Sequence, residues 1–171
     1  GHYLGPEWTR DGRELDPALA GWADAVEEMK SDLVSLFALQ KLADGGLATP
    51  ERLAAARASG ILRVLNDNRP RRDQPYQLMQ LVQFNWFLDK GLLTTTAEGF
   101  LEIHEEKYAA TAASLLEETI ALQLAGDPDA GEKFFTRWTD WQPGLHEAIG
   151  KRMRDAQTTR FNLVRYAALG E

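Results

Sequence analysis

Residues 15–44 read LDPALAGWADAVEEMKSDLVSLFALQKLAD, and their pattern indicates the class of fold. Its apolar side chains recur at alternating spacings of four and three residues, which places them on one helix face for about six turns. Asp16 and Pro17 form a start signal, and Gly45 and Gly46 form an end signal. The sequence therefore predicts a long helix over residues 17–44. Its apolar stripe consists of Leu15, Leu19, Trp22, Val26, Met29, Leu33 and Leu36.

Similar signals divide the rest of the chain into shorter elements. We expect helices over residues 50–65, 75–90, 104–125 and 128–139, and a further helix that begins at Gln142 and Pro143. The run LLTTTAEGFLEI, residues 92–103, has β-branched residues on both sides of a turn at Glu98 and Gly99, which indicates a small β-hairpin. The segment 158–166 is partly alternating and is expected to be extended.

These elements predict a mostly α fold of about five to six helices with one small β-hairpin. We expect residues 1–171 to form a single helical domain, in which residues 1–14, rich in glycine and proline, form a loop.

Composition excludes several classes of function. The chain has 19 basic and 26 acidic residues, a net charge of −7 and no cysteine. Nucleic acid is not expected as a partner, because phosphate binding needs clustered Lys and Arg. A metal site must use His, Asp or Glu. No apolar run is long enough for a membrane span and no signal peptide is present, so we expect no membrane partner and a cytoplasmic protein.

Three acidic residues, Asp24, Glu28 and Asp32, recur every fourth position of the first helix and therefore share one face. Such a row is often only a solvated surface, because each like-charge pair destabilises a helix by no more than roughly 0.2 to 0.5 kcal/mol, which a surface in water tolerates. The alternative is that a cation, or a histidine held by one, relieves the repulsion.

The histidines at positions 104 and 146 do not form a metalloprotease helix, which needs two histidines in an HExxH or HExxGH pattern. His104 is followed at the fourth position by Tyr108, and HEAIGK, which begins at His146, ends in Lys151. We therefore interpret both as surface or capping histidines.

Four segments occur in an order that resembles the dipeptidyl peptidase III family of zinc peptidases, in its shorter branch, some members of which are fused to Nudix domains. The resemblance extends to about Asp129. The segments are GHYLGP (residues 1–6), EEMKSDLVSLFAL (27–39), VQFNWFLDKGLL (82–93) and LLEETIALQLAGD (115–127).

In that family HExxGH is followed by an EE-x-K/R-x-D/E segment. The resemblance implies that His2 is the second histidine ligand of zinc, Glu28 the glutamate ligand, and Asp32 the acidic residue that orients a ligand histidine. Glu27, like Asp32, is then expected to contact a metal ligand and not the metal itself. Adjacent helix residues are about 100° apart, so we expect Glu28 to face the N-terminal loop near His2 and Glu27 to point elsewhere.

Longer family members have a histidine on the third helix that is thought to stabilise the transition state. At the nearest position this chain has Tyr76, which could donate to a developing oxyanion or could be a half-buried aromatic at a helix start.

The resemblance implies the C-terminal part of a zinc metallopeptidase that hydrolyses short peptides, with the first histidine and the general-base glutamate before Gly1. The N-terminal part of the same protein is then its partner, and we expect the fragment alone to be inactive and to bind no zinc tightly. Gly1-His2 is also the pair that a cleaved purification tag would leave. The alternative function is a helical interaction or regulatory module that keeps the scaffold without catalysis.

Overall fold

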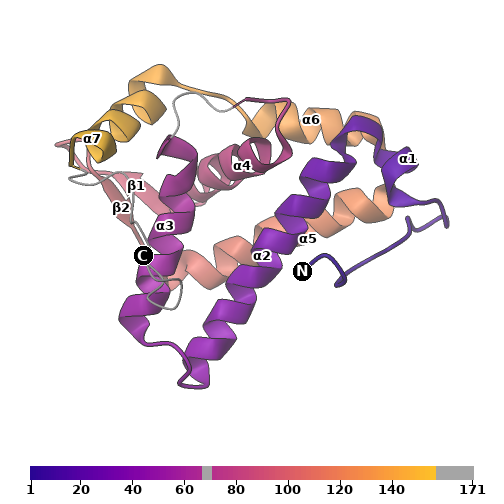
Figure 1. Cartoon of the computed structure of the whole chain (residues 1–171). Coiled ribbons are helices and arrows are strands. Elements are labelled where there is room, and N and C mark those ends of the chain that lie inside the picture. Colours follow the sequence, from indigo (N-terminus) through magenta and orange to yellow (C-terminus); the bar gives the residue numbers. More distant parts are fainter. Residues whose placement is uncertain (67–70, 157–171) are drawn as a thin grey trace, which may run out of the picture.

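The computed structural model describes residues 1–66 and 71–156, and it confirms a mostly α fold with one small hairpin (Figure 1). The predicted extended segment 158–166 lies outside the described residues. None of the helices in the described ranges is long and apolar enough to cross a membrane. The elements are α1 (Leu15–Leu19), a 3-10 turn (Ala20–Trp22), α2 (Ala23–Asp44), α3 (Pro50–Asn66), α4 (Pro75–Asp89), β1 (Leu93–Thr95), β2 (Leu101–Ile103), a 3-10 turn (Glu105–Lys107), α5 (Tyr108–Ala125), α6 (Pro128–Trp138), a π-helical turn (Pro143–Glu147) and α7 (Ala148–Ala156).

Helix α2 is the centre of the fold. It packs against α4 and α5, and it is joined to α3 by a short turn (Figure 1). Val26, Met29 and Leu33, from the predicted stripe, are fully buried. Burying each such side chain is worth roughly 1.5 to 3 kcal/mol, so the stripe holds α2 in the core. The opposite face of α2 remains available for polar side chains.

The predicted helix over residues 17–44 is interrupted, which corrects the sequence prediction. Ala20 has a φ of 50°, a left-handed conformation that ends α1 and opens a 3-10 turn. Trp22 then stacks on Phe135 of α6, with ring centroids 4.9 Å apart and an interplanar angle of 15°. Gly131 leaves room for this indole, since a Cβ there would lie 2.9 Å from Trp22 Cδ1. Packing on α6 therefore accounts for a break that the apolar spacing does not reveal.

The hairpin has its turn where the sequence predicts it. Leu93 pairs with Ile103 in the antiparallel register, and Gly99 takes a left-handed φ of 78° within the turn. The His104 N–H donates to the Leu92 carbonyl at 2.8 Å, which continues the ladder by one step. Because His104 is used in this ladder, the next α-helix begins at Tyr108 and not at residue 104.

Candidate metal site

The first residues of the chain lie against α2. Gly1 makes the closest approach, since a Cβ on this residue would lie 2.5 Å from Ser31 Cα and 2.6 Å from the Ser31 carbonyl oxygen. Only glycine fits such a contact between two backbones. This contact positions His2 over the middle of α2.

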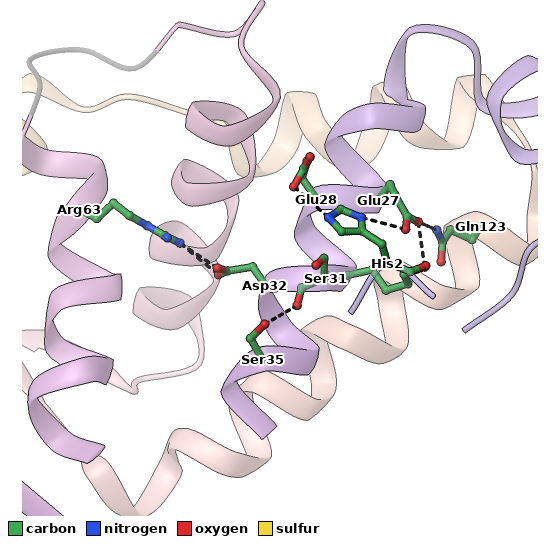
Figure 2. A network of polar contacts seen from close by, with 9 residues as sticks. His2, Glu27, Glu28, Ser31, Asp32, Ser35, Arg63 and Gln123 are labelled. Atoms are coloured by element: carbon green, nitrogen blue, oxygen red, sulfur yellow. Dashed lines mark hydrogen bonds and ion pairs between the residues drawn. The ribbon is translucent and has the colours of Figure 1, made fainter. Parts of the chain in front are cut away.

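The imidazole of His2 lies between two carboxylates of α2 (Figure 2). His2 Nδ1 is 3.3 Å from Glu27 Oε1, and His2 Nε2 is 3.7 Å from Glu28 Oε2. Glu28 lies near His2, as predicted, but the expectation that Glu27 points elsewhere is wrong. The two ring nitrogens face opposite sides of the imidazole, so side chains from adjacent helix positions can each reach one of them.

Two further residues surround Glu27. Lys30 lies 2.9 Å from Glu27 Oε2 through its Nζ, and the Gln123 side-chain amide donates to the same oxygen at 2.8 Å. Lys30 is part of the motif that suggested the family, and Gln123 belongs to another of the four segments. Nothing in the sequence pattern indicated that either side chain would be buried at this position.

Asp32 has different partners. It accepts hydrogen bonds from Arg63 of α3, at 3.1 Å to each carboxylate oxygen, and from Gln83 of α4 at 2.9 Å. Figure 2 shows its carboxylate pointing towards Arg63 and away from His2. The repulsion along the acidic row is thus relieved at Asp32 by Arg63. Its assigned role of orienting a ligand histidine stays a prediction, because that histidine is expected before Gly1.

Tyr76 lies in the first turn of α4 and is exposed. A hydrogen bond to the Glu28 carboxylate, together with the negative charge of that group, raises the pKa of the Tyr76 hydroxyl. This influence of Glu28 on its hydroxyl is what links Tyr76 to the candidate site. The prediction of a half-buried aromatic is wrong, and a catalytic role for Tyr76 stays a prediction.

The other histidines are placed elsewhere. His146 caps the π-helical turn, because its Nδ1 accepts from the Gln142 N–H at 3.0 Å while its Nε2 lies 2.8 Å from Asn85 Oδ1. Its surface alternative is wrong, since only 1% of it is exposed. His104 is half-buried and bonds to Thr94 at 2.9 Å.

The cluster borders a hollow of about 310 Å³ between the N-terminal loop, α1 and α2. His2, Glu27 and Gln123 are among the residues that line it. Three acidic residues of the loop and α1 line it as well, namely Glu7, Glu14 and Asp16. Within residues 1–66 and 71–156, no group of three or more His, Asp and Glu side chains is arranged to hold a metal ion. His2 and Glu28 therefore form at most part of a metal site.

Comparison with known proteins gives matches in structure. No protein-family model matches the chain, and no curated protein matches its sequence. The dipeptidyl-peptidase III of Corallococcus sp. strain EGB superposes with a TM-score of 0.76 and 26% identity, over 90% of this chain and 29% of that chain. The enzyme from Caldithrix abyssi has the same fold, with a TM-score of 0.70 and 20% identity, over 88% of this chain and 29% of that chain.

The chain thus spans 29% of the length of each of these two proteins. The chain has the fold of the matching section of a dipeptidyl-peptidase III, which confirms the resemblance of this chain to the dipeptidyl peptidase III family.

Proposed function

We propose that the chain is the C-terminal part of a zinc-dependent metallopeptidase that hydrolyses peptide bonds of short peptides. The observation that carries this proposal is the placement of the His2 ring, with Nε2 facing Glu28 and Nδ1 facing Glu27. A histidine that binds zinc commonly uses one nitrogen for the metal and donates the other N–H to a carboxylate.

The donor distances fit zinc. Two ligands bound at about 2.0 to 2.1 Å with a tetrahedral angle between them lie roughly 3.3 Å apart. His2 Nε2 and Glu28 Oε2 are 3.7 Å apart, so a small movement would bring both into ligand distance. When bound, zinc lowers the pKa of its water towards 7 and polarises the substrate carbonyl.

The residues of the chain would then have distinct roles. His2 and Glu28 supply two protein ligands, and Glu27 fixes the tautomer and orientation of His2 by accepting from Nδ1–H. Tyr76 would donate to the carbonyl oxygen of the substrate as that oxygen gains negative charge. The first histidine and the general-base glutamate come from the segment before Gly1, and the N-terminal part of the protein supplies most of the peptide cleft.

The cytoplasmic location of the protein stays a prediction.

The test is to compare this chain with a longer form that includes the residues before Gly1. We expect those residues to read HExx, the longer protein to retain zinc after dialysis against a weak chelator, and its dipeptide release to stop when the metal is removed. The 171-residue chain alone should retain no stoichiometric zinc and release no dipeptide. Peptidase activity of the short chain would overturn the proposal, and a longer protein with no bound zinc and no activity would favour the interaction module.

A further inference from the structure

Lys30 is a buried lysine at the edge of the candidate metal site. Its side chain is only 3% exposed, and its Nζ lies 2.9 Å from Glu27 Oε2. The same Nζ donates to the backbone carbonyl of His2 at 3.2 Å. Burying a charged group is costly unless it is paired and hydrogen-bonded, and both partners of this ammonium group belong to the contact between the N-terminal segment and α2.

Gln123 of α5 completes the arrangement around Glu27. It is 1% exposed, and its amide donates to Glu27 Oε2 at 2.8 Å. One oxygen of Glu27 therefore receives two buried donors, while the other oxygen faces His2 Nδ1 at 3.3 Å. A carboxylate held at Oε2 in this way has little freedom to rotate Oε1 away from the imidazole.

The tautomer of His2 follows from this arrangement. An ionised carboxylate only accepts hydrogen bonds, and of the two carboxylates beside the ring only that of Glu27 lies within hydrogen-bond distance, at 3.3 Å from Nδ1 against 3.7 Å between Nε2 and Glu28 Oε2. The closer contact favours the form of His2 with the proton on Nδ1 and leaves Nε2 unprotonated on the side of Glu28. The positive charge of Lys30 also offsets the repulsion between the neighbouring carboxylates Glu27 and Glu28, so that both can lie beside one imidazole.

We infer that Lys30, supported by Gln123, is a positioning residue that holds His2 by two contacts. Through Glu27 it sets the ring so that Nε2 is unprotonated and faces Glu28, and through the His2 carbonyl it anchors the backbone. That this arrangement serves metal binding rests on the proposed function. The positioning of His2 by Lys30 does not depend on the proposed function, because it can be measured in the chain without metal.

A purely structural ion pair would behave differently. Its loss would lower the free energy of unfolding but would leave the ring nitrogens of His2 in the same protonation pattern. Removal of a positioning residue changes that pattern and is repaired by a residue of the same charge. Arginine is such a residue, and the family motif also accepts it at this position.

The experiment measures the ring 15N chemical shifts of His2 by NMR in the metal-free 171-residue chain. At about pH 8.5 the two shifts report which ring nitrogen carries the proton. We expect the Nδ1–H form in the wild type and in Lys30→Arg, and a change to mainly Nε2–H in Lys30→Met. Lys41→Met is the matched control, because Lys41 is exposed in the last turn of the same helix.

An Nδ1–H ring in Lys30→Met, or an Nε2–H ring in the wild type, would overturn the inference. If Lys30→Met lost its helical circular dichroism, Gln123→Met, which removes the other donor to Glu27 Oε2, would carry the same test. In the longer protein Lys30→Met should weaken zinc binding about tenfold, the low end of effects from residues that orient ligands, and Lys30→Arg should restore it. A longer wild type that binds no zinc would contradict the proposed function while leaving the tautomer result intact.

Discussion

Gly1 touches the backbone of Ser31 so closely that the two residues leave no space for a side chain at position 1, where a Cβ would lie 2.5 Å from Ser31 Cα. This contact holds the N-terminal segment on α2 and brings His2 to Glu27 and Glu28 (Figure 2). The placement of His2 beside these two carboxylates therefore depends on one backbone approach.

Gly1→Ala should displace His2 from α2, because the added methyl group must move one backbone away from the other. A shift of about 1 Å at a reacting centre can cost roughly 100-fold in rate, so we expect a loss of about that size in the peptidase activity of the longer protein. Steady-state hydrolysis of a short peptide would measure it. Gly144→Ala is the control, since a Cβ at Gly144 meets nothing within 4 Å. Equal activity of Gly1→Ala and wild type would show that the close approach is not needed.

Two helical glycines should respond in opposite ways to alanine. Gly60 lies inside α3 with open space around it, so Gly60→Ala should raise the free energy of unfolding by about 0.5 to 1 kcal/mol. Gly131→Ala would place a methyl group 2.9 Å from Trp22 Cδ1 and should lower the free energy of unfolding by about 1 to 3 kcal/mol. Urea denaturation of both variants checks this pair. Stabilisation by both substitutions would mean that the Trp22 contact with α6 does not constrain the fold.

His146 should make stability depend on pH. Burial lowers its pKa from the usual value of 6.5, so the unfolded chain binds a proton more readily than the folded one. The resulting stability is present above about pH 6.5 and is lost as the pH falls through the lower pKa of the folded state. The difference in unfolding free energy between pH 7.5 and pH 5.5 should therefore be smaller in His146→Gln than in the wild type. An unchanged difference would mean that His146 does not titrate in this way.

Glu27→Gln should weaken zinc binding in the longer protein by about 10- to 100-fold, the usual range for a carboxylate that orients a ligand histidine. The neutral amide holds His2 Nδ1 less firmly and no longer offsets the charge of Lys30. Asp24→Asn is the matched control, because Asp24 lies in the first turn of the same helix and its side chain is exposed. Zinc competition with a chromophoric chelator gives both affinities. If the two variants bind zinc equally well, Glu27 is only a surface residue.

Much of the fold could be predicted because cap residues and apolar spacing act locally. Helix α6 begins at Pro128, where the sequence predicts it, with Asp127 as its cap accepting from the Asp129 N–H at 3.0 Å, and the hairpin turn forms at Gly99. The errors come from contacts between distant segments. The break at Ala20 depends on stacking with α6, and the late start of α5 depends on the pairing of His104 with Leu92.

The candidate site was predictable in part for the same reason. Spacing along α2 placed Glu28 on the face towards the N-terminal segment, but it could not show that Glu27 also reaches His2, because that depends on the orientation of one ring. Nor could it show that Lys30 is buried or that Gln123 reaches Glu27 from a residue 96 positions away in the sequence. Long-range polar contacts leave no local pattern in a single sequence.

Zinc affinity of the longer protein, measured with and without the Glu28 carboxylate, tests whether His2 and Glu28 are zinc ligands. Replacing the anionic oxygen donor by a neutral amide in Glu28→Gln should weaken zinc binding by more than about 100-fold, beyond the range for residues that only orient ligands. Circular dichroism should show the same helical content in both proteins, because the apolar stripe of α2 does not include Glu28. A Glu28→Gln protein that binds zinc as tightly as the wild type would show that Glu28 is not a zinc ligand.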